Sequence, residues 1–355
     1  MKGIIAGVTL TAVIVLSGLV TLVFALLFVG CNRNPGKNPE EKIEYVVSKA
    51  YENGYFVGSI LVANQGKVIY RNNFGMSDAE NKVSITDSTK FLIASLSKPI
   101  TAILILRLKD QGKINLYDEI GKYFNVTNNV VSKVTIHQLL THTSGIEELI
   151  SENHELEEAD LTNAKFNFEP GSAFRYCNTE YVILKEIAER ASGKSFKELV
   201  EQEICGPAQM KSTGVASDLD LVNNLAIGYG TTDQITPVEI GYSLKIVDGA
   251  GSIYSSVSDL FKLDRALYSN ELLSKETIEL MEKQHVKEKF GYGWYLRERG
   301  GTWDVMYHEG DLPGFTSFFS RRTEKNETVI LLSNSGGVDL SDLENDIARI
   351  LKFDN

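Results

Sequence analysis

An uninterrupted apolar segment near the start of the sequence is the feature that most constrains how this chain can fold. Residues 3–30 carry no charged side chain, and Lys2 stands directly before them. At about 1.5 Å per residue, a helix of this length more than spans a hydrocarbon layer of about 30 Å, and a signal-peptide core has only about 7 to 15 residues. We therefore expect residues 1–31 to be a transmembrane anchor or a lipoprotein signal.

The apolar segment ends at Cys31, after Leu27-Phe28-Val29-Gly30. This junction resembles the site where bacterial lipoproteins are cleaved before a lipid-bearing cysteine, although Phe28 stands where an aliphatic residue is usual. A lipidated Cys31 and a retained helix are equally compatible with it. More basic residues follow the segment than precede it, which by charge alone would place the rest of the chain in the cytoplasm.

Residues 32–41 have the composition of a linker, with two prolines, a glycine and no large apolar side chain. The remaining residues, 42–355, are long enough to bury a large core. The whole chain is 43% hydrophobic and 23% charged, close to the averages for folded soluble proteins. We expect residues 42–355 to form one folded unit.

Both ends of this unit predict a mixture of helix and strand. After an amphipathic helical pattern, alternating segments at 56–63 and 67–71 flank Asn64-Gln65-Gly66 as a hairpin. Near the other end, a capping box at Ser341 begins a last helix. Four segments before it have strand character, at 292–297, 303–307, 315–321 and 328–332.

Helical patterns predominate between the two ends, over about 110–250, and include 137–143, 179–191 and 195–204. The simplest assembly is an α+β fold. Both chain ends build an antiparallel sheet flanked by helices, and the mainly helical middle is an inserted subdomain with a cleft beside the sheet.

Charge and motif content exclude several functions. The chain has 36 basic and 47 acidic side chains, a formal charge of −11, which disfavours nucleic acid as a partner. Its histidines and cysteines form neither H-E-x-x-H nor C-x-x-C, so we expect no metal, and no other cofactor is indicated.

The tetrad Ser95-Leu96-Ser97-Lys98 can carry nucleophilic chemistry. A serine hydroxyl needs a neighbouring group to take its proton, and residues three apart on a helix share one face, as Ser95 and Lys98 do. A helix beginning at Ser95 would also direct free N–H groups at a developing oxyanion. The pattern alone is weak, and Ser97 offers a competing hydroxyl.

Two further polar motifs follow in order, Tyr176-Cys177-Asn178 and His308-Glu309-Gly310. With them the chain, from about Ile43 to its C-terminus, resembles the serine β-lactamase and D-alanyl-D-alanine peptidase superfamily on its class C side, which uses Y-x-N where class A has S-D-N. The matching segments are FLIASLSK at 91–98, LLTHTSGI at 139–146, EPG at 169–171, YCNT at 176–179, GAGSIYSS at 249–256, YGW at 292–294, HEG at 308–310 and PGF at 313–315.

The resemblance implies a role for each motif residue. Ser95 is the nucleophile, and Tyr176 is the general base if the Lys98 ammonium makes its phenol acidic. Asn178 would hold Lys98 and a substrate carbonyl, and the amide of Asp311 would supply the second oxyanion donor. The catalytic domain is expected outside the cytoplasm, at the cell envelope.

The third motif departs from the commonest family pattern. His308 replaces a lysine and adds a group that ordinarily titrates near neutrality. Gly310 allows the strand edge to approach the substrate closely. Glu309 stands where many relatives have Ser or Thr, and a glutamate facing the cleft would repel the carboxylate of a penicillin or a terminal D-alanine.

The sequence thus favours a serine hydrolase that acts through an acyl-enzyme on an amide or ester bond. Its substrate is expected to be a small molecule or a peptide, and its role that of a peptidase or esterase of the cell envelope. A true β-lactamase and a non-catalytic, penicillin-binding-like sensor remain as alternatives. The sequence predicts no oligomeric state. His142, in the 139–146 motif, is interpreted as structural, and Cys177 as a small buried thiol.

Overall fold

The computed structural model describes residues 36–216, 222–299 and 302–353. The predicted membrane segment, residues 1–31, lies outside these ranges. Among the described helices, none combines the length and the apolar character needed to cross a membrane.

The first described helix, α2 (Pro39–Glu52), begins inside the predicted linker 32–41. Its N-terminus is well specified: the Asn38 side chain accepts a hydrogen bond from the Glu41 N–H, and proline occupies the first helical position. The folded unit therefore starts earlier than composition predicts, because proline was counted as a linker residue although it is favourable at this position.

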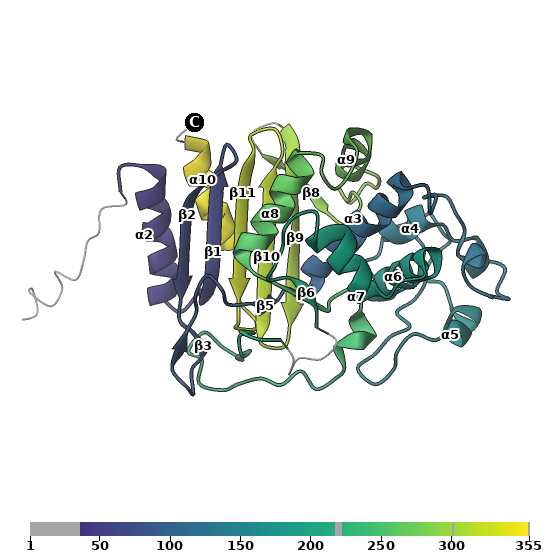
Figure 1. Cartoon of the computed structure of the whole chain (residues 1–355), viewed down its shortest axis with the longest axis horizontal. Helices are drawn as coiled ribbons and strands as arrows, with labels where there is room; N and C mark the ends of the chain where they lie inside the picture. Colours follow the sequence, from purple (N-terminus) through teal and green to yellow (C-terminus); the bar gives the residue numbers. More distant parts are fainter. Residues whose placement is uncertain (1–35, 217–221, 300–301, 354–355) are drawn as a thin grey trace, which may run out of the picture.

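A six-stranded antiparallel sheet forms the centre of the molecule, in the order β2-β1-β11-β10-β9-β8 (Figure 1). Its strands are β1 (Gly58–Asn64), β2 (Lys67–Phe74), β8 (Tyr295–Arg299), β9 (Thr302–Leu312), β10 (Phe315–Arg322) and β11 (Glu327–Ser333). β1 pairs with β11, placing Leu61 opposite Ile330. The prediction that both chain ends build one antiparallel sheet is confirmed.

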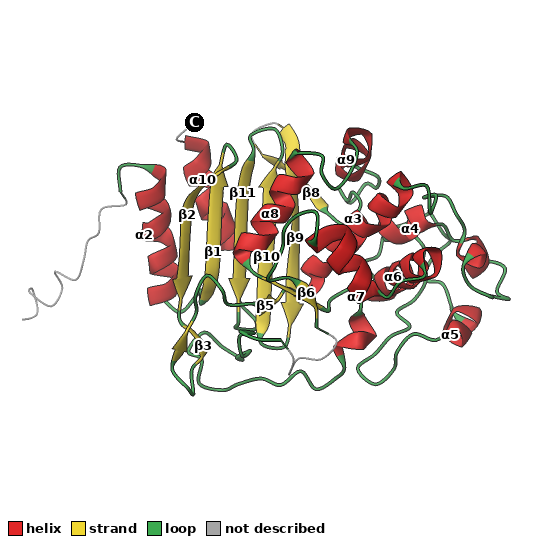
Figure 2. Ribbon diagram, in the orientation of Figure 1, coloured by secondary structure: helices red, strands yellow, loops and turns green. Residues whose placement is uncertain are grey.

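Alternation along the strands gives the sheet two apolar faces. One face, including Ile60 and Phe318, packs under α2 and α10 (Ser341–Phe353). The opposite face, including Leu61 and Phe319, belongs to the larger core shared with α8 (Val257–Tyr268) and the helical part of the chain (Figure 2). The sheet is thus covered by helices on both sides.

The middle of the chain is mainly helical and lies beside the β8 edge of the sheet (Figure 1). Its helices are α3 (Ser97–Asp110), α4 (Ile136–Leu140), α5 (Glu158–Asn163), α6 (Asn178–Ser192), α7 (Phe196–Leu199), a π-helical turn (Val200–Cys205), 3-10 turns at Ile120–Lys122, Val131–Lys133 and Leu244–Val247, and α9 (Lys275–Glu282). Short strands lie outside the main sheet: β3 (Met76–Asp78) pairs with β4 (Val83–Ser84), and β5 (Phe91–Leu92), β7 (Ile253–Ser255) and β6 (Gly214–Val215) form one small sheet.

Helix α4 ends earlier than the predicted span 137–143. It begins with a capping box between Thr135 and Gln138 and its last helical residue is Leu140. His142 then adopts a left-handed backbone conformation with φ of 55°, which no helix can include. The predicted helix 195–204 is likewise divided into α7 and a π-helical turn.

Candidate active site

Ser95 lies in a 3-10 turn, Ala94–Leu96, that joins β5 to the N-terminus of α3. The turn opens with Ala94 at φ of 49°, a conformation that is uncommon for any residue with a side chain. Both neighbours of Ser95 are buried, while its own side chain is half-buried and lines a cavity. The serine is therefore presented at the start of a helix, as the sequence predicts.

Ser97, the competing hydroxyl of the tetrad, faces the interior. It is fully buried, and its Oγ accepts a hydrogen bond of 3.1 Å from the Ile253 N–H of β7. Ser95 is thus the tetrad serine that faces the cavity.

Lys98 is fully buried, and its Nζ is held by three oxygen atoms. It donates to Ser95 Oγ at 3.0 Å, to Asn178 Oδ1 at 2.8 Å and to the Ala250 carbonyl at 2.9 Å. Asn178 Oδ1 and the carbonyl can only accept hydrogen bonds, whereas the serine hydroxyl can also donate. A neutral Lys98 that keeps its hydrogen bonds to Asn178 Oδ1 and the Ala250 carbonyl therefore directs its lone pair at the Ser95 hydroxyl.

Burial lowers the pKa of Lys98 to about 7, although the Glu148 carboxylate acts in the opposite direction. A large fraction of the side chain is consequently neutral at physiological pH. Lys98 has both the geometry and the proton affinity of a base for Ser95.

Tyr176 lines the same cavity as Ser95. Burial raises the pKa of Tyr176 above its ordinary value, although the Ser95 side chain acts to lower the pKa of this phenol. The Nζ of Lys98 lies 4.7 Å from the centroid of the Tyr176 ring, over the ring face rather than at the hydroxyl. Burial thus opposes the acidic phenol that the sequence predicts, and the general-base role of Tyr176 stays a prediction.

Asn178 begins α6, and a glutamate absent from the sequence prediction fixes it there. Glu148 accepts hydrogen bonds from the backbone N–H of Asn178 at 2.9 Å and of Thr179 at 2.7 Å. A carboxylate at a helix N-terminus satisfies free N–H groups and the helix dipole. Glu148 thereby orients the amide that binds Lys98.

Gly310 brings β9 against the serine turn. A Cβ atom at this position would lie 2.4 Å from the Ile93 carbonyl oxygen and 3.0 Å from the Ser95 nitrogen. Only glycine fits such an approach, as the sequence predicts. Asp311, the next residue, lines the same cavity.

His308 is buried beside Tyr176, with the ring centroids 6.1 Å apart. Its Nδ1–H donates to the Glu309 carbonyl at 2.6 Å, and its Nε2 has no hydrogen-bond partner among the described residues. Burial, reinforced by Lys98, lowers the pKa of His308 to about 3. The prediction of a group that titrates near neutrality is therefore wrong, because the ring is neutral across the physiological range.

Glu309 lines the cavity from the other face of the sheet. Alternation along β9 places it on the same side of the sheet as Tyr307, opposite in direction to His308 and Gly310, and its side chain is exposed. Partial burial and the neighbouring Asp339 raise the pKa of Glu309. The glutamate thus contributes to the rim of the cavity rather than to the surface around Ser95.

The cavity has a volume of about 640 Å³. Besides Ser95, Tyr176 and residues 308–311, it is lined by Tyr295, Tyr307, Thr316, Ser317, Phe318 and residues 337–341. Its acidic side chains are Glu309, Asp311 and Asp339. Among the described residues, no group of His, Cys, Asp and Glu is arranged to hold a metal ion.

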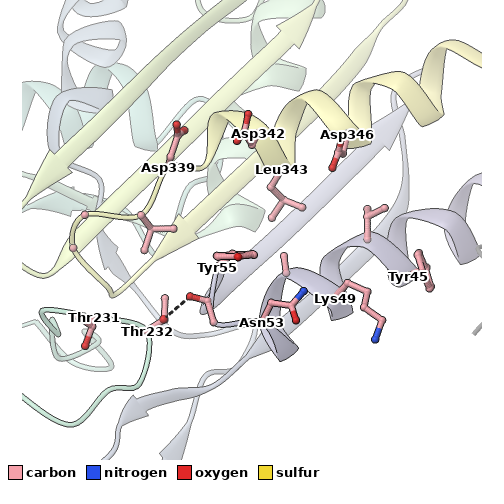
Figure 3. Close-up of a pocket in the computed structure, with 16 residues that line it drawn as sticks. Tyr45, Lys49, Asn53, Tyr55, Thr231, Thr232, Asp339, Asp342, Leu343 and Asp346 are labelled. Carbon is pink, nitrogen blue, oxygen red and sulfur yellow. Dashed lines mark hydrogen bonds between the residues drawn. The ribbon is translucent and has the colours of Figure 1, made fainter. Parts of the chain in front are cut away.

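A second cavity of about 530 Å³ lies between α2 and α10 (Figure 3). Figure 3 shows Tyr45 on α2 and Asn53 directly after it opposite Asp346 on α10, with the Thr232 hydroxyl bonded to the Gly54 carbonyl. It contains none of Ser95, Lys98 or Tyr176 but shares residues 337–339 with the first cavity. The chemistry of the site therefore resides in the first cavity.

A serine at the start of a buried helix, a lysine one turn on and a facing Tyr-x-Asn segment beside an antiparallel sheet define the serine β-lactamase and transpeptidase class. The family model described as Beta-lactamase matches residues 46–352, and this chain belongs to that family.

Known proteins resemble the chain over most of its length. A penicillin-binding protein of Bacillus subtilis (strain 168) is 27% identical over 330 residues, covering 84% of this chain and 72% of the relative. The octameric penicillin-binding protein homologue from Pyrococcus abyssi superposes with a TM-score of 0.77 at 27% identity, covering 88% of this chain and 77% of that one. The D-amino acid amidase from Ochrobactrum anthropi SV3 shares the fold, with a TM-score of 0.74 at 22% identity over 88% of this chain and 98% of the amidase.

Proposed function

We propose that the chain is a class C-like serine hydrolase that forms an acyl-enzyme at Ser95 on an amide or ester substrate. The observation that supports this most directly is the hydrogen bond between Lys98 Nζ and Ser95 Oγ, within a lysine whose pKa is lowered to about 7. Family membership agrees with a hydrolase of this mechanism.

In the proposed acylation, Ser95 Oγ attacks the carbonyl carbon while its proton passes to Nζ of Lys98. The carbon–nitrogen or carbon–oxygen bond of the substrate then breaks, and the Tyr176 hydroxyl protonates the leaving atom. Lys98 then returns its proton to Tyr176, so both side chains regain their starting protonation states. Water cleaves the serine ester by the same proton transfers in reverse order.

The developing oxyanion requires preorganised donors. We assign this role to the backbone N–H groups of Ser95 and Asp311, which lie on the serine turn and on β9. The close approach enforced by Gly310 supports this assignment, since it holds the two backbone segments together. Asn178 positions Lys98 and is available to the substrate carbonyl.

The acidic side chains Glu309, Asp311 and Asp339 at the rim of the cavity disfavour substrates whose carboxylate would extend toward this rim. We accordingly propose a peptidase or esterase of the cell envelope rather than a β-lactamase. The apolar segment 3–30 and the penicillin-binding relatives support the envelope location.

Intact-mass analysis after treatment with a fluorophosphonate tests the serine chemistry. We expect one adduct on the wild type and none on Ser95→Ala. Equal labelling of both proteins would exclude Ser95 as the nucleophile.

A substrate panel then tests the specificity, using nitrocefin, a D-alanyl-D-alanine peptide, a D-amino-acid amide and a short-chain ester. We expect nitrocefin to be the poorest substrate. Rapid nitrocefin turnover would favour a true β-lactamase, and acylation without product release would favour a penicillin-binding sensor.

A further inference from the structure

His142 contacts the backbone on both sides of Tyr176. The His142 carbonyl accepts a hydrogen bond of 2.9 Å from the Arg175 N–H, and its Nδ1 accepts one of 3.3 Å from the Cys177 N–H. One residue thus accepts hydrogen bonds from the backbone N–H groups of both neighbours of Tyr176.

The His142 ring also supports the Tyr176 ring directly. The two ring centroids are 4.6 Å apart with an interplanar angle of 38°. Phe174, Tyr181 and Phe290 surround the imidazole at centroid distances of 5.1 to 5.9 Å, and the side chain has no exposed surface. His142 touches neither Ser95 nor the cavity in which substrate would bind.

Glu180 holds the His142 ring in this orientation. Its Oε2 lies 2.5 Å from His142 Nδ1, and its Oε1 accepts hydrogen bonds from the hydroxyl and the N–H of Ser144. If the hydrogen between them lies on the carboxyl group, the single lone pair of Nδ1 is shared between Glu180 and the Cys177 N–H. Burial raises the pKa of Glu180 and lowers that of His142, which agrees with a neutral pair.

The backbone of His142 adopts a left-handed conformation. Its φ of 55° is uncommon for residues other than glycine, although Asn, Asp and His are enriched there. Such a conformation persists only where surrounding contacts over-determine it, and it concentrates at functional sites. Here those contacts are the ones that fix Tyr176.

We propose that His142 is a positioning residue, which together with Glu180 holds the Tyr176 hydroxyl at Ser95 for acyl transfer. This inference rests on the proposed function. It predicts a change in the rate of chemistry at each active site rather than in substrate binding, because His142 does not reach the cavity.

Two substitutions of His142 separate the effect of its hydrogen bond with the Cys177 N–H from the effect of its positive φ. Asparagine and glycine both tolerate a positive φ. The Oδ1 of asparagine can occupy the place of Nδ1 and accept from the Cys177 N–H, whereas glycine offers no acceptor. His142→Asn therefore tests rescue, with His142→Gly as its matched control.

The measurement is the acylation rate constant for a chromogenic ester, divided by the fraction of sites that a fluorophosphonate titrates. We expect His142→Gly to lower this rate constant about 10- to 100-fold with little change in KM, and His142→Asn to stay within about threefold of the wild type. Normalising to titrated sites removes the effect of misfolded protein, which a merely structural role would produce.

Equal normalised rate constants for the wild type and His142→Gly would overturn the inference, while leaving the proposed function intact. Should wild-type protein fail to acylate, the proposed function itself is wrong. If His142→Gly yields no titratable protein, Glu180→Leu supplies the same test, because it removes the group that orients the imidazole. A wild-type rate constant in Glu180→Leu would also overturn the inference.

Discussion

Lys98 Nζ lies 3.0 Å from Ser95 Oγ, and its remaining hydrogen bonds go to Asn178 Oδ1 and the Ala250 carbonyl. Burial lowers the pKa of this lysine to about 7. The hydroxyl that must lose a proton therefore faces an amine that is able to take it, while burial raises the pKa of the Tyr176 phenol. The following predictions depend on this relationship and on the packing that maintains it.

Acylation is expected to depend on the neutral form of Lys98. Below pH 7 the lysine is protonated, so the acylation rate constant should fall about tenfold per pH unit, and above pH 7 it should reach a plateau. The measurement is the rate of fluorophosphonate labelling between pH 5 and 9.

A histidine that titrates near neutrality would also give an inflection in the pH dependence of the labelling rate, and His308→Asn provides the control. Because the pKa of His308 is lowered to about 3, the inflection should stay near pH 7 in this variant, whatever its absolute rate. Loss of the inflection in His308→Asn would contradict the assignment to Lys98.

The two serines of the tetrad should respond differently to truncation. Ser97 is buried and bonded to Ile253, so Ser97→Ala should lower the unfolding midpoint while the remaining folded protein still acylates. Ser95→Ala should remain folded and fail to acylate. Intact-mass labelling together with a thermal melt distinguishes the two, and labelling that disappears only in Ser97→Ala would reverse the assignment.

The sequence predicted the sheet well because its strands carry local signals. Alternation and the Asn64-Gln65-Gly66 turn mark the hairpin. The last helix begins at Ser341 as predicted, but the Ser341 hydroxyl donates to Asp339 instead of forming a capping box with Glu344. The boundary at Pro39 and the end of α4 were less predictable. Both depend on single-residue backbone conformations that hydrophobic periodicity does not report.

The identities of the site residues were predictable, but their protonation was not. The spacing of Ser95 and Lys98 predicted that they share one helix face. The order of the three motifs predicted that Tyr176 and His308 belong to the same site. A pKa depends on burial and on neighbours from distant segments, such as Glu148 beside Lys98. Glu148 and Glu180 stand in no recognisable motif of their own, so their contacts with the site emerge only from the fold.

Close contact at Gly310 should make this position intolerant of any side chain. In Gly310→Ala the new Cβ would lie 2.4 Å from the Ile93 carbonyl oxygen, and relief requires β9 to move from the serine turn. A shift of about 1 Å is enough to lower kcat about 100-fold. Steady-state hydrolysis of a short-chain ester measures the loss.

Gly241→Ala is the matched control for this substitution. No atom lies within 4 Å of the position that its Cβ would occupy, and its backbone does not require glycine. Its kcat should remain at the wild-type value. Similar kcat values for the two alanine variants would refute the close-approach role of Gly310.

A buried ion pair fastens α8 to the sheet and should dominate local stability. Arg321 Nε donates to Asp264 Oδ1 at 2.8 Å, both side chains are buried, and the Thr328 hydroxyl also donates to Asp264. Removing one partner leaves a charge buried without full compensation, which costs about 3–5 kcal/mol. Asp264→Asn should therefore lower the free energy of unfolding by this amount, measured by denaturant titration.

A surface pair of the same chemistry supplies the comparison. Asp346 contacts Arg349 on α10, where both side chains are largely exposed, and such pairs contribute only about 0–1 kcal/mol. Asp346→Asn should therefore leave the denaturation midpoint nearly unchanged. Because α8 packs against β1 and β11, loss of the buried pair should reduce stability throughout the sheet that carries Gly310. Equal midpoints for the two asparagine variants would mean that water reaches Arg321 and solvates its charge.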